Sequence, residues 1–419
     1  MTSPPPRSGG ALTEQTALTE QTVLAEQTVL AEQAATAEQA ALTKALAERA
    51  APLMTGSSLR CGPVTRPTLL PNLRRLWRDA STVQLGTDPA GAVVLQLRRP
   101  ELARVLDLLD GAHTEPAVLA AGEALGLAPA EVHGLVQTLR DVGLVVGAHA
   151  LVPAGLPERV HRRLSVEAAA IALRLRTGPP GPDRMPADVL RRRYTSRVVV
   201  AGDGPLLAPL AALLAASGVG HVDPVVDGVT GAGDVLVGGL RVDDVGVSRA
   251  VATGDAVTRY APGTELSAAR MDHVDLVVRV GDRHPPALAR RGLRLAGLPR
   301  LELTVRLGTV LVGPLVRPAG SPCRACLELH RRDRDPIWPV LAAQLATAPP
   351  GDGEPCASAT ALAGVAFAAD EVLAFLDGTA PRTEAAIVEI PRAGELRRRE
   401  WAAHPRCDCR RRRRAAGTG

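Results

Sequence analysis

The chain has 419 residues, of which 46% are hydrophobic but only 2% aromatic, so a large core must be built mostly from Val, Leu and Ala. Lys44 is the only lysine, which excludes lysine-based chemistry from the rest of the chain. The net charge of +5 is modest, and an arginine block at 410–414 predicts a solvated basic tail over 411–419. We expect no signal peptide and no membrane-spanning segment, hence a cytoplasmic protein with reduced cysteines.

The first 56 residues form a low-complexity repeat tail. Glu-Gln pairs recur at 14, 20, 26, 32 and 38, a period of six. Six residues advance a helix by about 240° beyond one full turn, so the repeated leucines scatter around it, whereas a coiled coil needs a period of 3.5. We therefore assign this tail no catalytic role.

The segment 57–152 predicts a winged helix-turn-helix domain. Two apolar runs separated by a Thr-Asp-Pro-Ala turn indicate a hairpin, and amphipathic helical patterns follow it. The expected elements in chain order are two strands, three helices and a short closing hairpin: 81–86, 91–97, 100–111, 115–126, 128–143 and 144–153.

This unit could bind either DNA or a peptide. The third helix offers only His133, Gln137 and Arg140 as long polar side chains, without the basic stripe that base recognition requires. We therefore favour a peptide that adds as a strand to a sheet edge. A purely structural role is the third alternative. The expected peptide contacts are Val93, Val94, Leu95 and Gln96 of the second strand and His133 and Gln137 of the third helix.

A linker rich in Pro and Arg (153–185) leads to an α/β domain at 186–410. Its start reads as strand, glycine turn, helix and strand, which is typical of a Rossmann-like nucleotide-binding fold. Gly202 and Gly204 would form the tight turn, although Leu207 stands where a third glycine is usual. Asp227 follows the second strand and could reach a ribose.

Further apolar strands are expected at 274–282 and 300–318, followed by a small-residue helix near 358–378. Long apolar strands alternating with helices predict a mostly parallel sheet covered on both faces.

Four of the six cysteines occur as two close pairs in this domain. Cys323 and Cys326 form C-x-x-C, and Cys407 and Cys409 form C-x-C. Four thiolates suit a tetrahedral Zn²⁺ site with no open coordination position, hence a structural zinc. The alternatives are a redox dithiol and chance. The charged run 330–335 that follows Cys326 favours a solvated or partner-facing surface over a catalytic His–Asp pair.

The segments 198–204, 275–282 and 308–327, with the small-residue helix and the paired-cysteine ending, occur here together. This combination resembles the ThiF/MoeB and ubiquitin-activating-enzyme family over about half of the chain. The resemblance implies adenylation of the C-terminus of a small protein with ATP and Mg²⁺, and a structural zinc.

A narrower resemblance rests on the segment 321–345 and the ending His-Pro-Arg-Cys-Asp-Cys at 404–409. These are similar to ThiF-like proteins of actinobacterial azole and azoline peptide (TOMM) clusters, which act as cyclodehydratase partners or leader-peptide-binding proteins. In that family a winged-helix peptide-recognition unit precedes the ThiF-like domain, in the order expected here.

The family's ATP site carries over onto Gly202, Gly204, Asp227 and Asp282, the last as the Mg²⁺ ligand. Leu207 and the absence of lysine from the domain depart from the family pattern, as do Arg283 and His284 directly after Asp282. We therefore expect a degenerate nucleotide site.

Adenylating relatives carry a cysteine just before the small-residue helix, where this chain has Cys356. A nucleophilic Cys356 would need a lowered pKa, to which a helix N-terminus contributes. The alternative is a small residue at a helix start.

These observations predict a non-catalytic scaffold in ribosomal peptide modification. It would bind a precursor's leader peptide and present it to a YcaO-type cyclodehydratase, which closes azoline rings. The two other hypotheses are an active ThiF-type adenylyltransferase, with Cys356 as acceptor, and a winged-helix DNA-binding regulator. A homodimer is compatible with the first hypothesis, which involves neither membrane nor nucleic acid.

Overall fold

The protein is seen in a computed structural model that describes residues 66–88, 91–177, 185–270, 273–282, 297–318, 322–347 and 354–409. The predicted repeat tail (1–56) and basic tail (411–419) lie outside the described residues, as do Cys61, Arg283 and His284. The predicted domain boundaries stay predictions.

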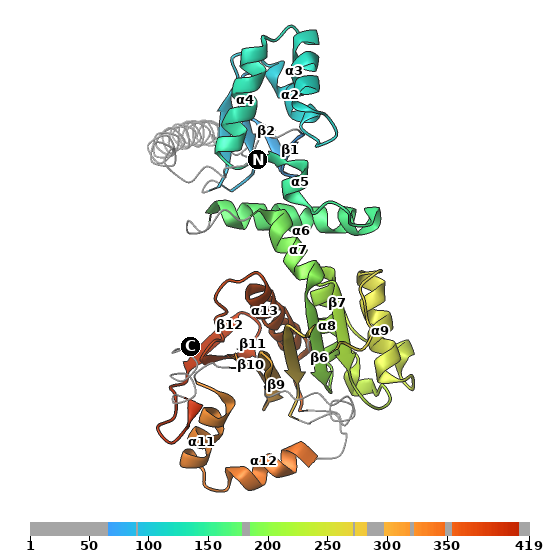
Figure 1. Ribbon diagram of the computed structural model, residues 1–419, viewed down its shortest axis with the longest axis vertical. Helices are drawn as coiled ribbons and strands as arrows, with labels where there is room; N and C mark the ends of the chain where they lie inside the picture. Colours follow the sequence, from blue (N-terminus) through green and yellow to red (C-terminus); the bar gives the residue numbers. More distant parts are fainter. Residues whose placement is uncertain are drawn as a thin grey trace, which may run out of the picture. The chain divides into compact units, whose positions relative to one another are not determined.

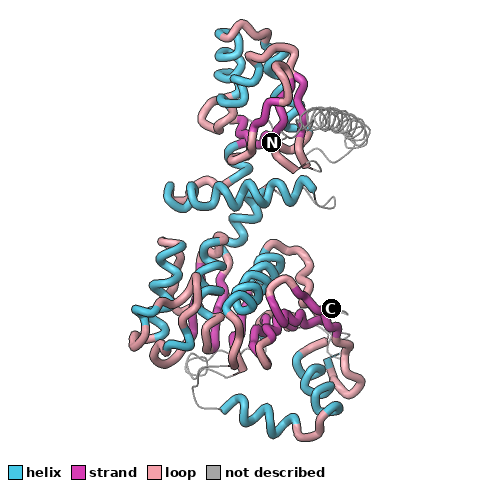
Figure 2. The backbone as a smooth tube through the Cα atoms, turned by 180° about the vertical axis from the view of Figure 1, so that it is seen from behind, coloured by secondary structure: helices cyan, strands magenta, loops and turns pink. Residues whose placement is uncertain are grey.

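Most of the elements that precede the large sheet contribute to one apolar core, in which Val105, Val118, Val132 and Leu139 are fully buried. Figure 1 labels most of these elements and Figure 2 colours them by type. In chain order they are β1 (Pro67–Leu69), β2 (Arg75–Trp77), β3 (Thr82–Leu85), β4 (Val93–Gln96), α2 (Leu102–Leu108), α3 (Glu115–Ala124), α4 (Pro129–Asp141), β5 (Val145–Gly147), α5 (Ala148–Leu151), α6 (Glu158–Thr177) and α7 (Pro186–Thr195).

The predicted hairpin and helix triplet are confirmed as elements. β3 and β4 pair antiparallel, from Thr82 opposite Gln96 to Leu85 opposite Val93. β2 pairs with the other side of β3, so β4 is an edge strand of this three-stranded sheet. α3 begins after Thr114, whose hydroxyl accepts a hydrogen bond from the Ala117 N–H, as an N-cap residue does.

The predicted closing hairpin at 144–153 is wrong. β5 pairs instead with β1, with Leu69 opposite Val145, and residues 148–151 form the short helix α5. Leu69 and Val145 are both buried, so pairing with a strand about 75 residues earlier covers apolar surface on both. Local pattern alone does not reveal such a distant partner.

Much of the predicted linker is the helix α6. Its residues Leu164, Ala168 and Ile171, spaced at i, i+4 and i+7, are buried in the same apolar core. The Arg163 side chain donates to the carbonyl oxygens of Ala215 and Ala216 at 2.9 and 2.7 Å. α6 is thus packed on one face and tied through Arg163 to the end of another helix.

One guanidinium joins α6 and α7 to two later helices. Arg193 of α7 has no exposed side-chain surface. Its Nε and Nη2 donate to the two carboxylate oxygens of Asp377 at 2.8 and 2.6 Å. Its Nη1 donates to Glu167 Oε1 at 2.8 Å and to the Ser217 carbonyl at 3.1 Å. Ser217 and Asp377 are the C-cap residues of α8 (Leu207–Ala216) and α13 (Ser358–Leu376), where a cation is favoured.

The larger sheet has seven strands in the order β12-β11-β10-β9-β8-β6-β7. The elements of this part are β6 (Arg197–Gly202), α8 (Leu207–Ala216), β7 (His221–Val225), the short 3₁₀ helices η1 (Ala232–Asp234) and η2 (Val242–Asp244), α9 (Arg249–Tyr260), β8 (Leu276–Val280), β9 (Arg300–Arg306), β10 (Thr309–Val316), α11 (Arg324–Arg334), α12 (Trp338–Thr347), α13 (Ser358–Leu376), β11 (Ala386–Arg392) and β12 (Glu395–Glu400).

The sheet is mixed, which corrects the prediction of a mostly parallel one. β7, β6, β8 and β9 pair in parallel, but β9, β10, β11 and β12 pair antiparallel. The chain reverses between β9 and β10 at Leu307 and Gly308, which both have positive φ. Such a two-residue turn fits the twist of a hairpin and leaves no room for a crossover helix.

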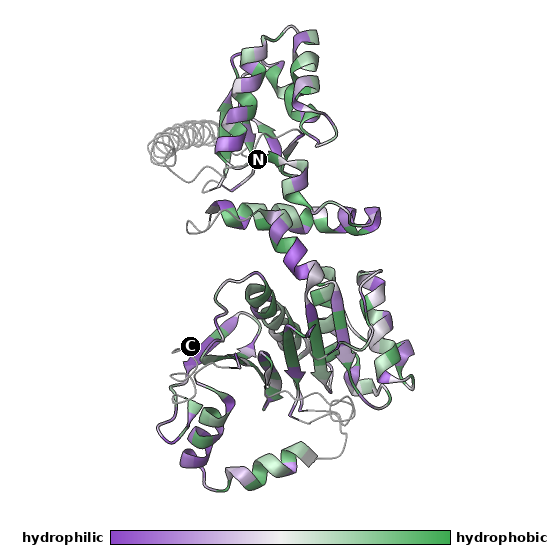
Figure 3. Ribbon diagram, viewed as in Figure 1, coloured by the Kyte–Doolittle hydropathy of each residue, from purple (hydrophilic) through white to green (hydrophobic). Residues whose placement is uncertain are grey.

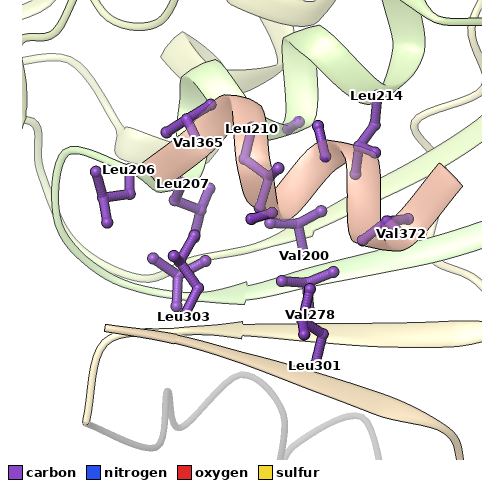
Figure 4. Packing of buried hydrophobic residues seen from close by; sticks show 14 of the residues in the cluster. Val200, Leu206, Leu207, Leu210, Leu214, Val278, Leu301, Leu303, Val365 and Val372 are labelled. Carbon is purple, nitrogen blue, oxygen red and sulfur yellow. The ribbon is translucent and has the colours of Figure 1, made fainter. Parts of the chain in front are cut away.

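One face of the sheet carries most of the apolar core (Figure 4). Leu207, Leu210 and Leu214 of α8 are buried, and Val365 and Val372 of α13 join the same cluster. They pack on strand residues that are also fully buried or nearly so: Val200, Val278, Leu301 and Leu303. β6, β8 and β9 therefore point alternate apolar side chains at α8 and α13.

Both edges of the seven-stranded sheet are protected. β12 carries Arg397, Arg398 and Arg399, all exposed, and charged side chains on an edge strand oppose pairing with another chain. At the other edge, Glu265 forms a bridge to His221 of β7, and its carbonyl accepts the Val222 N–H.

α13 is the one described helix that is long and apolar enough to cross a membrane by length and composition. Half of its most apolar window is buried inside the protein, where it packs on β10, β11 and α8. Its hydrophobic colouring in Figure 3 therefore matches a core position under the sheet.

Replacing Arg193 by Met should lower the free energy of unfolding by about 3–5 kcal/mol, because Asp377 and Glu167 lose a buried partner. Arg193→Lys should fall between Met and the native chain, since one ammonium cannot reproduce the forked contact. Urea denaturation followed by circular dichroism measures both.

The matched control is Arg191→Met on the same helix, where the pair with Asp188 is about half exposed on each side. We expect a loss of at most about 1 kcal/mol there. Equal effects at the two positions would contradict the role given to Arg193.

Candidate functional site

The two cysteine pairs come together, as predicted. Sγ of Cys323 lies 3.9 Å from that of Cys326 and 3.6 Å from that of Cys407. Sγ of Cys326 lies 3.4 Å from that of Cys409, and all four sulfur atoms lie within 4.8 Å of one another. Four sulfur atoms around one tetrahedral metal ion, each about 2.3 Å from it, would lie about 3.8 Å apart. The donor set and spacing fit a metal ion.

Local structure sets the position of each sulfur. Cys323 is the N-cap of α11 and Cys326 lies in its first turn, with the Cys326 N–H donating to the Cys323 carbonyl at 3.0 Å. Cys407 and Cys409 follow β12 and are buried. The cluster therefore ties the start of α11 to a segment more than 80 residues later.

Burial raises the pKa of the Cys407 thiol to about 12 and raises the pKa of Cys326 as well. Backbone N–H groups of Cys409 and His404 act in the opposite direction, but more weakly. None of the five described cysteines forms a disulfide. A bound cation would favour the thiolate forms of Cys326 and Cys407 by compensating their charge.

The predicted glycine turn lies between β6 and α8. Gly202 has φ +149°, and a Cβ there would lie 1.8 Å from the Val280 carbonyl oxygen, so β6 and β8 approach too closely for any side chain. A Cβ at Gly204 would meet no atom within 4 Å. The turn thus keeps open space above Gly204. Leu207, in the place of a third glycine, is 1% exposed and fills the core below α8.

The two predicted nucleotide carboxylates lie in different surroundings. Asp227 follows β7, half-buried, and its carbonyl accepts a hydrogen bond from Arg249 Nη1 at 3.0 Å. Arg249 also pairs with Asp234 at 2.8 Å. Asp282, after β8, accepts from Arg306 Nη2 at 2.7 Å and from the Thr304 hydroxyl at 3.3 Å. The expected Mg²⁺ ligand is therefore ion-paired with an arginine.

Arg306 belongs to a polar row along one face of β9, which the sequence analysis did not identify. Arg300, Glu302, Thr304 and Arg306 alternate with buried Leu301 and Leu303. Glu302 lies 3.6 Å from the buried Arg279 of β8. The alternation of charged and apolar residues over 300–306 is visible in the sequence. The whole segment 300–318 was interpreted there as apolar strand, so its polar face was not recognised.

Cys356 lies just before α13, separated from its first residue by the N-cap Ala357, as predicted from the sequence. Burial raises the pKa of its thiol, and its Sγ lies 3.6 Å from the Gly308 carbonyl oxygen. A nucleophilic thiol needs a lowered pKa, so this shift gives no support to the nucleophilic role.

The predicted peptide contacts lie on two elements. In β4, Leu95 is buried while Val94 is 44% exposed, and Val93 and Gln96 flank them. On α4, His133 is exposed and its Nδ1 lies 3.4 Å from Glu115, while Gln137 is half-buried.

Comparison with known proteins finds no matching family model and no matching curated protein. Among solved structures, the chain is similar to the microcin C7 biosynthetic enzyme MccB in complex with N-formylated MccA, with a TM-score of 0.51 and 14% identity over 82% of this chain and 99% of that one. A structure of E. coli MccB with ATP matches with a TM-score of 0.51, 15% identity and coverage of 82% and 99%.

A third solved structure, that of PaaA, matches with a TM-score of 0.50 and 16% identity over 68% of this chain and 96% of that one. The chain therefore shares the mixed α/β fold of these proteins. At this level of identity the likeness shows the fold alone.

Alkylation of Cys356 by iodoacetamide should show its half-maximal rate at a higher pH than a free cysteine does, because burial disfavours the thiolate. Mass spectrometry of peptides from the full chain measures the rate, and Cys356→Ser identifies the signal. If the alkylation rate of Cys356 were half-maximal at a lower pH than that of N-acetylcysteine, the raised pKa would be contradicted and a nucleophilic role favoured.

Proposed function

We propose that this chain is a ThiF-like, non-catalytic subunit of ribosomal peptide modification. It binds the leader segment of a precursor peptide and presents it to a YcaO-type cyclodehydratase in the cytoplasm. The fold supports this class, because MccB structures contain the peptide MccA.

The ion pair between Asp282 and Arg306 carries the non-catalytic part of the proposal. Adenylation needs a carboxylate free to bind Mg²⁺ and cations directed at phosphate. Here the carboxylate contacts a guanidinium at 2.7 Å and a hydroxyl at 3.3 Å. Mg²⁺ would have to displace an arginine whose side chain is about 27% exposed, and the turn beside it lacks the third glycine.

The edge strand β4 supports peptide binding by strand addition. Its pairing with β3 uses one side only, so backbone groups on the other side face outward within the described sheet. Buried Leu95 fixes the strand to the core, while Val94 leaves an apolar side chain for a bound peptide to contact. His133 and Gln137 of α4 complete the proposed contact surface.

The four-cysteine cluster would hold a structural Zn²⁺ through Cys323, Cys326, Cys407 and Cys409. Thiolates occupy all four tetrahedral positions, so no substrate could bind the metal. Bound zinc would fasten α11 to the chain after β12 and keep this end of the domain rigid for a partner.

An active adenylyltransferase is the second candidate. The open space above Gly204 favours it, because a phosphate needs close approach to a glycine turn. MccB has been solved with ATP on a similar fold. Cys356 would then need another source of activation.

A DNA-binding regulator has less support. On α4, Arg140 pairs with Glu115 at 2.7 Å and His133 lies 3.4 Å from the same carboxylate. The basic side chains Arg140 and His133 therefore both lie beside an acid of α3, which lowers their value for binding phosphate.

Titration calorimetry of the full chain with Mg·ATP should give no binding heat, because the Asp282 carboxylate is already paired with the Arg306 guanidinium. Pyrophosphate exchange should also be absent. The control variant is Arg306→Ala, which releases the carboxylate without changing the glycine turn. Binding by the native chain that Asp282→Ala abolishes would overturn the non-catalytic proposal.

Val94→Glu should weaken the binding of fluorescently labelled candidate leader peptides about tenfold or more, since it places a charge beside the added strand. Val166→Glu on α6 is the matched control, because Val166 is 57% exposed and lies away from β4 in sequence and element. Equal loss in both variants, or none in either, would contradict strand addition at β4.

A further inference from the structure

A buried imidazole lies beside the cysteine cluster. The side chain of His404 is 3% exposed, and its Nε2 lies 2.7 Å from Asp333 Oδ2. Its Nδ1 accepts the backbone N–H of Arg406 at 3.1 Å. A ring nitrogen accepts only when it carries no proton, so these partners assign the proton to Nε2, which donates it to Asp333.

Asp333 holds a tight turn at both ends. One carboxylate oxygen accepts from His404 and the other from the guanidinium of Arg406. Within the same turn, the Cys407 N–H donates a hydrogen bond to the His404 carbonyl oxygen at 3.0 Å. The turn that begins the Cys407–Cys409 segment is thus fixed to a carboxylate 71 residues earlier in the chain.

The same face of α11 carries the carboxylate and a cysteine. Cys326, His330 and Asp333 are spaced at i, i+4 and i+7, which places them in one row along the helix. The ring of His330 packs edge-on against His404 at 4.7 Å between centroids, and its Nε2 lies 2.9 Å from the Ala402 carbonyl oxygen. Three successive turns of α11 therefore contact the segment that bears the second cysteine pair.

We propose that Asp333, His330 and His404 are positioning residues that present Cys407 and Cys409 to a soft divalent metal ion held by the four thiolates. They are not ligands themselves. By ordering residues 402–409 before the ion binds, they remove a conformational cost that binding would otherwise meet. This inference rests on the metal site proposed above, but on none of the peptide chemistry.

The test uses Zn²⁺ and Co²⁺ with the full chain. Zinc affinity is measured by competition with a chromogenic chelator, and the Co²⁺ absorption spectrum reports how many thiolates bind. We expect Asp333→Asn to weaken Zn²⁺ binding about 10–100-fold while the Co²⁺ spectrum still reports four thiolates. His404→Ala should act similarly, and His404→Gln, whose amide can donate to Asp333, should recover part of the loss.

Asp335→Asn is the matched control, because it removes the same charge at the C-cap of α11, where the Asp335 carboxylate accepts the Ile337 N–H within its own turn. Its zinc affinity should stay native. Circular dichroism at saturating zinc checks that each variant is folded, and Asp333→Asn, the isosteric change, decides if His404→Ala does not fold.

Native affinity in folded Asp333→Asn would overturn the positioning role while leaving the metal site intact. A Co²⁺ spectrum that loses nitrogen ligation in His404→Ala would also overturn it, by making His404 a ligand. No metal binding by the native chain would overturn both this inference and the zinc site, but not the proposed peptide binding.

Discussion

The forked contact between Arg193 and Asp377 is the interaction on which the arrangement of the chain most depends. α7 leads directly into β6, the strand that pairs with both β7 and β8. By joining α7 to the C-caps of α8 and α13, the guanidinium fixes the start of β6 under the two helices that cover its apolar face. Glu167 extends the same contact to α6. A hydrophobic residue could fill this space but could not set these four segments in register.

Hydrophobic pattern predicted the elements whose partners are close in sequence. The alternation of apolar residues and the glycine turns predicted two groups of elements at the observed positions: β3 and β4 with the three helices that follow, and the β6–α8–β7 unit. Hydrophobic pattern did not predict the pairing of strands far apart in sequence, nor the direction of a strand that is set by a two-residue turn. β5 joins β1 because both bury apolar side chains there, and the positive φ at Leu307 and Gly308 reverses the chain into β10. Leucine rarely adopts a positive φ, so Leu307 did not indicate a turn in the sequence.

The metal cluster was the most predictable part of the candidate site, because thiols are few and their short spacings already suit one ion. The ion pair of Asp282 with Arg306 was not predictable. With 49 Lys and Arg in the chain and one lysine among them, no spacing marks which arginine meets which acid. The contact of His404 with Asp333 was not predictable either, because the two residues lie 71 positions apart, although the i, i+4, i+7 row on α11 offered a signal.

The two protected edges of the large sheet have a consequence for selectivity. The charged side chains along β12 oppose pairing with an incoming strand, and Glu265 already pairs with the edge strand β7. A peptide that binds by backbone pairing would thereby be disfavoured at the largest of the three described sheets. The place where such a peptide binds would then depend first on which sheet edge can accept a strand, and only afterwards on contacts with the peptide's side chains.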